Sequence, residues 1–435
     1  APPPWPARRR SLRLSAFETF WDTPYYEQLQ YAGDARIAAL LAVYQTGDGR
    51  LLRNAIEQFD GSRNADGLTA SAYPSAVRQQ IPGFSLQWIA MVHDYWMINP
   101  DPSLVRRMLP GIRATIAWHE RHVGPTGLVG PLPWWPFLDW AEGWERGVPP
   151  GGRVGESIAL TLHLAHVARL AAELEQGLGR ADEAGRNSAL ADRLITAARV
   201  QGWDSARGLF VDSPGRDQAS QQTNALAVLA GALPAAKARE LMARVLVDRS
   251  LTQASLYFRF HLDEALFRTG LGGSYLARLG PWHDMVARGM TSTAETVDPT
   301  RSDSHVWSAQ PNYFLLAGVA GIRPAAPGFA EVRIAPDLGD LRSAIMSMPH
   351  PAGTIAAAFR RRGADGLTAT IALPDATRGH FVWRGAEITL PPGRSTVHCA
   401  PPRPSPRRAV RPVSDVVRAI PIPDSGSVVC LVKSD

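Results

Sequence analysis

Carboxylates and aromatic residues are concentrated in one short segment near the N-terminus. Asp22, Glu27 and Asp34 lie within thirteen residues, among four aromatic side chains. Glycosidic-bond hydrolysis uses a pair of carboxyl groups, so this spacing favours that chemistry. If Asp34 caps the helix that follows, Asp22 and Glu27 lie in the preceding loop and can face a cavity. If the helix already begins at Pro24, Glu27 and Asp34 share one face. The alternative is that Asp34 is only an N-cap and Glu27 a solvated loop acid.

A second cluster of polar residues lies near Glu295 in the sequence. The segment continues through Arg301 to His305 and Trp307, directly before a predicted helix. An acid, a histidine and a tryptophan in this order could bind a set of sugar hydroxyls. The alternative is that Glu295 only forms an ion pair with Arg301, and the spacing leaves both interpretations open.

Four tryptophans stand between residues 134 and 144 in a loop flanked by Gly and Pro: Trp134, Trp135, Trp140 and Trp144. Tryptophan faces suit the apolar face of a pyranose, and Asp139 within the same run would bind hydroxyls. We expect at least two of the four tryptophans to pack the loop onto the protein body instead.

Other chemistries lack their motifs. The sequence contains no H-E-x-x-H, C-x-x-C, G-x-S-x-G or P-loop pattern. Its only cysteines, Cys399 and Cys430, favour two free thiols in a reducing compartment over a pairing near the C-terminus. His93 and His163 lie within helical patterns and are interpreted as structural. No cofactor or metal is expected.

Helical periodicity dominates from about residue 34 to residue 320. Many of the helices are joined by short turns, which makes them antiparallel neighbours and favours a toroid of helical hairpins. Three long stretches rich in Gly, Pro and Trp (62–82, 123–154 and 201–218) interrupt the helices, and such loops would form a functional rim. The predicted helices are 34–45, 50–60, 83–98, 102–121, 155–175, 181–199, 219–231, 235–247, 254–269, 273–289 and 306–319.

Beyond Gly321 the pattern changes to short apolar segments separated by turn residues, which predicts a small antiparallel β-domain. The predicted strands are 331–334, 353–359, 367–372, 379–383 and 395–399. The domain boundaries that follow are a basic N-terminal tail over 1–14, a helical catalytic barrel over 15–322, a β-domain over 323–400 and a Pro/Arg-rich tail over 401–435. Residues 427–432 could add an edge strand.

The charge of the chain is unevenly distributed. The formal net charge of +6 arises from four arginines in residues 1–13 and a net +3 in residues 401–435, which leaves the 387 residues between them near −1. This distribution gives no reason to expect a nucleic-acid partner. No apolar run reaches the length of a membrane span or of a signal peptide, so no membrane partner and a cytoplasmic location are expected. The chain begins at Ala1 without Met, which is compatible with processing or truncation.

The motifs resemble those of the bacterial α-L-rhamnosidases, family 78 of the glycoside hydrolases. That family has the pattern D-C-P-x-R-E-x-x-x-Y/W-x-G-D, and this chain reads D-T-P-Y-Y-E-Q-L-Q-Y-A-G-D from Asp22 to Asp34. The resemblance covers roughly residues 15–400. Further matching segments follow in order at 66–68, 72–75, 81–86, 91–96, 139–140, 295, 304–305 and 321–329.

The resemblance implies a mainly α fold, an (α/α)6 toroid followed by a small C-terminal antiparallel β-sandwich. It also implies removal of terminal α-L-rhamnosyl groups with inversion, with Glu27 as general acid and Glu295 as general base. The substrate would be a rhamnosylated glycoside or oligosaccharide. Because the usual N-terminal β-sandwich domains do not precede the barrel, a partner copy or further domains could cover it. The implied substrate-binding residues are Asp22, Asp34, Tyr31, Trp135, Asp139, Trp140, His305 and Trp307.

Two positions depart from the family pattern. Thr23 and Tyr26 stand where the family has Cys and Arg, and the loss of that Arg removes a fixed cation beside the acid. Two other functions therefore stay open. One is a non-catalytic carbohydrate-binding or scaffold protein with the same fold, and the other is a six-hairpin glycosidase with a different sugar preference.

Overall fold

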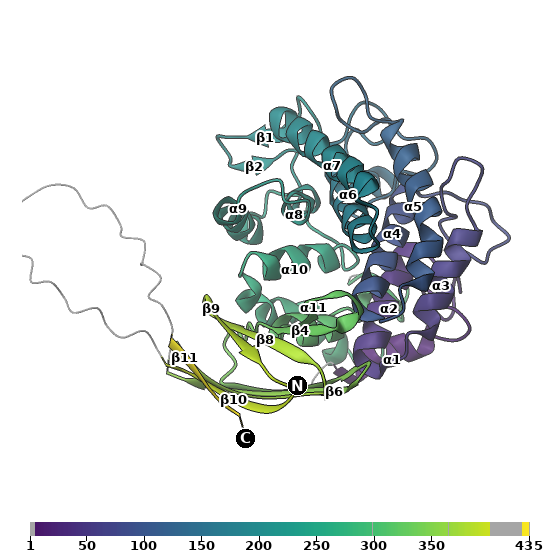
Figure 1. Cartoon of the computed structure of the whole chain (residues 1–435). Helices are drawn as coiled ribbons and strands as arrows, with labels where there is room; N and C mark the ends of the chain where they lie inside the picture. Colours follow the sequence, from purple (N-terminus) through teal and green to yellow (C-terminus); the bar gives the residue numbers. More distant parts are fainter. Residues whose placement is uncertain (1–4, 298, 364, 401–428, 435) are drawn as a thin grey trace, which may run out of the picture.

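The computed structural model describes residues 5–297, 299–363, 365–400 and 429–434. Helices form a ring, and two β-sheets lie against one side of it (Figure 1). The helices and their bounds follow the apolar spacing of the sequence closely, except where prolines interrupt them.

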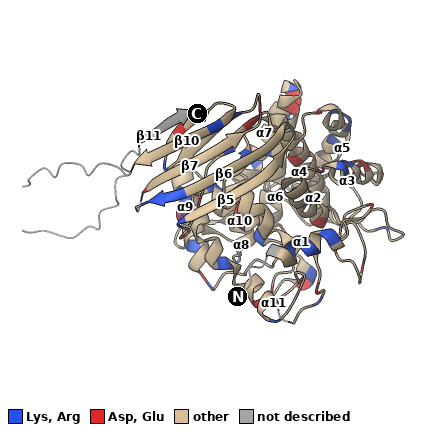
Figure 2. Cartoon of the chain, turned by 90° about the horizontal axis from the view of Figure 1, so that it is seen from below, with Lys and Arg blue, Asp and Glu red and all other residues tan. Residues whose placement is uncertain are grey.

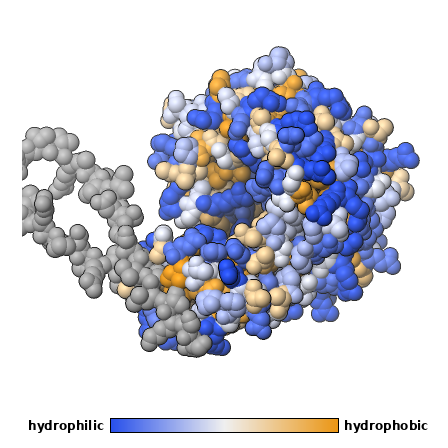
Figure 3. Space-filling model, viewed as in Figure 1, coloured by the Kyte–Doolittle hydropathy of each residue, from blue (hydrophilic) through white to orange (hydrophobic). Residues whose placement is uncertain are grey.

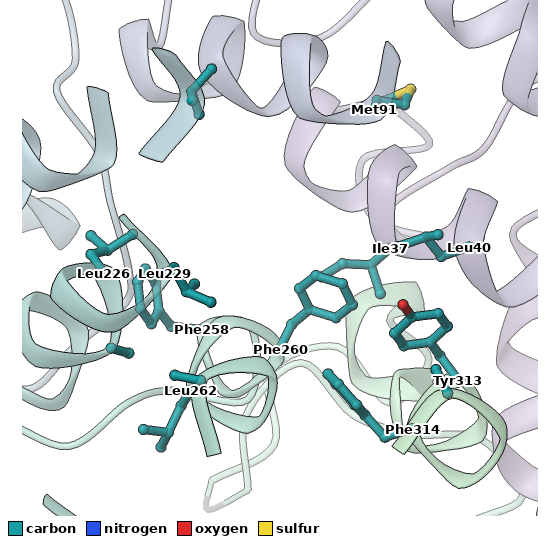
Figure 4. Packing of buried hydrophobic residues seen from close by; sticks show 14 of the residues in the cluster. Ile37, Leu40, Met91, Leu226, Leu229, Phe258, Phe260, Leu262, Tyr313 and Phe314 are labelled. Carbon is teal, nitrogen blue, oxygen red and sulfur yellow. The ribbon is translucent and has the colours of Figure 1, made fainter. Parts of the chain in front are cut away.

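Six helices form the inner layer of the ring. From α2 to α10 each inner helix packs against the next inner helix along the chain, and α12 packs against α2 to close the ring. The rings of Phe260 and Phe314, 5.4 Å apart, join α10 to α12, and apolar side chains of these helices meet in one core (Figure 4). The inner helices are α2 (Ala32–Thr46), α4 (Pro82–Ile98), α6 (Ile158–Gly177), α8 (Gln221–Leu229), α10 (Arg259–Arg268) and α12 (Pro311–Phe314).

Six outer helices cover the inner layer. In α3, Leu52, Ala55, Ile56 and Phe59 are buried at helical spacing, so only one face meets the core. The inner helix α2 is buried nearly all round. This two-layer ring confirms the (α/α)6 toroid. The outer helices are α1 (Trp5–Leu14), α3 (Arg50–Gly61), α5 (Ser103–Glu120), α7 (Ala181–Gly202), α9 (Ala235–Val247) and α11 (Gly280–Ala287).

The last two predicted helices of the ring are broken into short pieces. Within 273–289 the chain forms η2 (Gly272–Ser274), η3 (Leu276–Leu279) and α11. Within 306–319 it forms η4 (Val306–Ala309), α12 and η5 (Leu315–Val319). Pro281 and Pro311 stand at the starts of α11 and α12, where a missing backbone N–H costs least. A continuous helix over either range was therefore a wrong expectation.

The C-terminal strands form two sheets that pack face to face. One has the order β11-β10-β7-β6-β5 and the other β3-β4-β8-β9, with all pairs antiparallel except β4 and β8, which are parallel. The larger sheet spans one side of the ring (Figure 2). Its members are β5 (Ser343–His350), β6 (Gly353–Arg362), β7 (Gly366–Leu373), β10 (Gly393–Ala400) and β11 (Val429–Ser434); the smaller sheet holds β3 (Ile322–Pro324), β4 (Glu331–Ile334), β8 (Arg378–Trp383) and β9 (Ala386–Leu390).

The N-terminal arginine run belongs to a packed helix, not to a tail. Residues 5–14 form α1, in which Ala7, Arg8, Ser11 and Leu12 are buried. Burial lowers the pKa of Arg8 to about 10. The expectation of a tail over this range was wrong because a charge count does not reveal which side of a helix packs.

Cys399 is disulfide-bonded and stands opposite Cys430 in the register of β10 and β11. Opposed residues of antiparallel strands have Cα atoms about 4.5–5.5 Å apart, within the range that a disulfide spans. The expectation of free thiols was therefore wrong, and the two cysteines give no support for a reducing compartment. Residues 401–428 of the predicted tail lie outside the described part of the chain.

The surface of the ring seen in Figure 3 is mostly hydrophilic, with smaller hydrophobic areas between. Among the helices that the structure describes, none combines the length and the apolar character needed to cross a bilayer.

Candidate active site

The loop before α2 holds two of the predicted carboxylates. Asp22 Oδ1 accepts a hydrogen bond from the Leu29 backbone N–H at 3.0 Å, which folds the loop back on itself. Gln30 anchors the same loop, because its amide donates to Gln58 Oε1 and to the Tyr73 carbonyl, both at 2.8 Å. Asp22 is buried, whereas the side chain of Glu27 is 33% exposed.

Asp34 lies in the first turn of α2 and does not cap it. The helix begins after Tyr31, and no side chain caps it. Asp34 is buried, and its Oδ1 lies 3.0 Å from Nε2 of His305. Neither predicted helix start is correct, yet Asp22 and Glu27 do lie in the loop before the helix.

Glu295 lies in a long loop that is hydrogen-bonded to the N-terminal segments. Its own N–H donates to the Ser302 carbonyl at 2.8 Å. Thr293 N–H donates to Ser11 Oγ of α1 at 2.8 Å, and the N–H of Val306 donates to the Asp22 carbonyl at 2.9 Å. These bonds bring Glu295 beside carboxylates that precede it by more than 260 residues.

Aromatic residues line the site together with the carboxylates. Trp135 and Trp140 lie with ring centroids 5.8 Å apart, and Trp135 donates its Nε1–H to the Arg146 carbonyl at 2.9 Å. Trp307 packs on His305 at 4.0 Å and on Tyr257 at 5.0 Å. Among the four clustered tryptophans, Trp144 is buried and Trp135 is partly buried against the core, so at least two of them pack the loop as expected, although Trp135 also faces the site.

These residues enclose one cavity of about 190 Å³. A cavity of this volume holds several water molecules and suits a ligand about as large as a single monosaccharide unit. Nine of the ten predicted site residues line it. The lining residues are Asp22, Glu27, Tyr31, Asp34, Ile81, Phe84, Trp135, Phe137, Trp140, Glu295, Arg301, His305 and Trp307.

Asp139 is the predicted site residue that does not line the cavity. It is fully buried, and its Oδ2 accepts hydrogen bonds from Gln222 Nε2 at 2.7 Å and from the Ser255 N–H at 3.0 Å. Its Oδ1 accepts a further bond from the Ser255 hydroxyl. With both oxygens engaged, Asp139 fixes the loop that carries Trp140 from behind.

Burial shifts the pKa values of the acidic and histidine side chains that line the cavity. It raises the pKa of Asp22 to about 7, with a further rise from the negative charge of Asp34. It also raises the pKa of Asp34 well above its usual value and lowers that of His305. Burial raises the pKa of Glu295 as well, although His305 and Arg301 oppose that rise. A site with four crowded carboxyl groups can therefore hold both protonated and ionised members, as acid–base catalysis requires.

Arg301 is the site residue that sequence reasoning considered only as a partner of Glu295. Its Nη1 donates to Glu295 Oε1 at 3.1 Å, and its Nη2 donates to Glu27 Oε1 at 3.0 Å. Both interpretations of Glu295 therefore apply, because it pairs with Arg301 and also lines the cavity. The second contact joins residues 274 positions apart in sequence, which spacing alone does not reveal.

Comparison with known proteins identifies similar chains. Residues 5–256 match the model of the bacterial alpha-L-rhamnosidase 6 hairpin glycosidase domain, and residues 321–395 match the bacterial alpha-L-rhamnosidase C-terminal domain. No curated protein matches the chain.

Solved structures with the same fold include rhamnosidases from two bacteria. A GH78 family rhamnosidase of Bacillus sp. GL1 is 26% identical, with a TM-score of 0.79 over 87% of this chain and 41% of its own. The Streptomyces avermitilis alpha-L-rhamnosidase, complexed with L-rhamnose, is 20% identical, with a TM-score of 0.72 over 86% of this chain and 37% of its own. The chain thus spans less than half the length of either.

Proposed function

Because the chain belongs to the bacterial alpha-L-rhamnosidase 6-hairpin glycosidase family, we propose that it hydrolyses terminal α-L-rhamnosyl groups with inversion of configuration. Glu27 is the general acid and Glu295 the general base. The observation that carries the proposal is that both carboxylates line one small cavity and hydrogen-bond different nitrogens of a single guanidinium.

The separation of the two carboxyl groups distinguishes inversion from retention. An inverting glycosidase keeps its carboxyl groups about 6.5–9.5 Å apart so that a water fits between base and sugar. Here one polar group, the Arg301 guanidinium, already fits between them. Retention would require the carboxyl groups to lie only about 5–5.5 Å apart.

In the proposed reaction, Glu27 protonates the glycosidic oxygen as the bond from that oxygen to the anomeric carbon breaks. Glu295 removes a proton from a water, whose oxygen forms a new bond to the anomeric carbon from the opposite face. The products are free rhamnose and the alcohol, and the two carboxyl groups then exchange protons with solvent to return to their starting states.

The remaining cavity residues hold the sugar. Asp22, Asp34 and His305 accept or donate hydrogen bonds to its hydroxyls, and Tyr31 adds a further hydroxyl. Trp135, Trp140 and Trp307 offer ring surfaces for its apolar face. The Glu295 side chain is 5% exposed, and this burial raises the pKa of the proposed base, which makes it a stronger proton acceptor.

The test is hydrolysis of p-nitrophenyl α-L-rhamnoside. We expect Glu27→Gln and Glu295→Gln each to lower kcat by about 10²–10⁴-fold, the usual contribution of one acid–base group. Glu18→Gln, an exposed acid in the same N-terminal segment, is the control and should keep wild-type kcat. Equal rates for all four proteins would contradict the assignment. NMR of the first-formed sugar should show the β-anomer, and an initial α-anomer would exclude inversion.

A non-catalytic sugar-binding protein is the second candidate, because in this structure Arg301 occupies one oxygen of each proposed catalytic carboxylate. It predicts L-rhamnose binding without turnover. A panel of aryl glycosides in the same assay would also reveal a different sugar preference.

A further inference from the structure

Arg301 has a hydrogen-bonded backbone and a solvent-exposed side chain. Its N–H donates to Thr296 Oγ1 at 3.2 Å, and that hydroxyl donates to the Pro299 carbonyl at 2.9 Å. The side chain is 57% exposed. The loop therefore holds the start of the side chain in place while its guanidinium can move without disrupting a packed core.

The two ion pairs of Arg301 differ in strength. The Glu295 side chain is 5% exposed, whereas that of Glu27 is 33% exposed. Water and salt screen the exposed pair much more than the sheltered one. The contact to Glu27 is therefore the one that an entering ligand can break.

The bridged arrangement hinders the proposed reaction, because it engages one of the two oxygens of Glu27. A general acid must lie about 2.6–3.2 Å from the glycosidic oxygen, but Glu27 Oε1 already accepts from Arg301 at 3.0 Å. The guanidinium also occupies the space between the two carboxylates, where the scissile bond has to lie.

Among the described residues that line the cavity, Arg301 is the one with a permanent positive charge. The charged and titratable groups around Glu295 come from three elements. Arg301 and His305 lie in the same loop as Glu295, and Asp34 lies in α2. Glu27 and Asp22 lie in the loop before α2. The positive charge of Arg301 lowers the pKa of Glu295 against the effect of burial. Arg301 thus helps to keep the proposed base ionised.

We propose that Arg301 is a positioning residue that clamps Glu27 and Glu295 together in the empty enzyme and releases Glu27 when substrate enters, while staying paired with Glu295. This inference rests on the proposed function of the two glutamates. Arg301 then has two opposing effects on catalysis: it hinders the entry of substrate, and it helps to keep the proposed base ionised.

The test compares Arg301→Met with Arg288→Met. Arg288 Nη2 donates to the Val297 carbonyl of the same loop at 2.9 Å without lining the cavity, so its variant controls for loosening of the loop. In Arg301→Met we expect KM to fall about two- to fivefold, the size of an exposed ion pair that no longer has to be broken. We expect kcat to fall on the order of tenfold, since the base loses its positioning partner.

The pH profile provides a readout that a merely structural role would not change. The acid limb of kcat/KM reports the base of the free enzyme. Without the cation at residue 301 the pKa of Glu295 rises, so this limb should move to higher pH in Arg301→Met and not in Arg288→Met. Arg301→Lys should fall between wild type and Arg301→Met, because one ammonium cannot reproduce the two-pronged contact. Unchanged KM and pH profile in Arg301→Met would overturn the clamp.

L-Rhamnose binding, followed by tryptophan fluorescence, separates failure of the clamp from failure of the proposed reaction. Trp135, Trp140 and Trp307 line the cavity and report its occupation. Tighter binding by Arg301→Met in a protein without turnover would support the clamp while rejecting the hydrolase. Weaker binding by Arg301→Met than by Arg288→Met would show that the guanidinium is a sugar ligand and would overturn the clamp.

Discussion

At the scale of single residues, Asp139 shows how burial changes the task of a carboxylate. It stands one residue before Trp140, whose ring lines the cavity, yet its own oxygens face Gln222 and Ser255 behind the wall. Burial raises its pKa to about 6, and the hydrogen bonds from Ser255 and Gln222 oppose that rise. The side chain is therefore suited to support the position of Trp140.

Asp139→Asn should lower both stability and activity. The new amide N–H₂ cannot accept the bonds that the carboxylate accepts, so we expect a loss of about 2–4 kcal/mol in the free energy of unfolding. Urea unfolding and kinetics on the aryl rhamnoside measure the two effects. If Asp139 instead bound sugar hydroxyls directly, the variant would raise KM and leave stability unchanged. Asp217→Asn, in the exposed loop before α8, is the control.

At the scale of elements, α1 supports the loop that carries Glu295. Ser11 is fully buried; its Oγ accepts from the Thr293 N–H at 2.8 Å and lies 2.9 Å from Thr293 Oγ1. Thr293 is two residues from Glu295, so the position of the proposed base depends on a helix at the other end of the sequence.

Ser11→Ala should lower kcat and also reduce stability by about 1–3 kcal/mol, because a buried backbone N–H loses its acceptor. Ser15→Ala is a matched control, since the hydroxyl of Ser15 is also buried but has no hydrogen-bond partner among the described residues. Thermal unfolding and steady-state kinetics measure both effects. A stability loss with unchanged kcat would show that α1 does not position Glu295.

At the scale of the whole molecule, a partly buried ion pair joins the ring to the sheets. Both terminal nitrogens of Arg323, in β3, donate to the Glu264 carboxylate of α10 at 2.7 and 2.9 Å. Burial by itself would raise the pKa of Glu264, but the guanidiniums of Arg323 and Arg268 lower it to about 2. The contact links the two parts of the protein electrostatically.

Glu264→Gln should destabilise the protein by about 1–3 kcal/mol at pH 7, since it leaves a partly buried guanidinium without its counter-charge. The pKa of Glu264 is lower in the folded than in the unfolded state. Its stabilising contribution is therefore complete above about pH 4.5 and is lost as the pH falls toward 2. Urea unfolding should show a smaller difference between variant and wild type at pH 3 than at pH 7. Glu240→Gln, which breaks the exposed pair with Lys237, should change little at either pH. An equal difference at both pH values would contradict the linkage.

The sequence by itself predicted most of the ring, because helical apolar spacing is a local property. The positions of α2 to α10 and of five strands agree with their predicted ranges within five residues at each end. The order of motifs also indicated nine residues that meet in one cavity. Prolines shortened the last two helices, and one face of the Arg-rich N-terminal segment proved to be buried.

Only the tertiary structure decided which polar groups meet. The contact of Arg301 with Glu27, the burial of Asp139 behind the cavity and the bond from Thr293 to Ser11 join positions far apart in the chain. Such contacts depend on how the ring closes, and closure is determined by packing of whole helices against one another. The residue types therefore indicated the chemistry, while the closed ring determined the geometry of the site and the pKa shifts of its side chains.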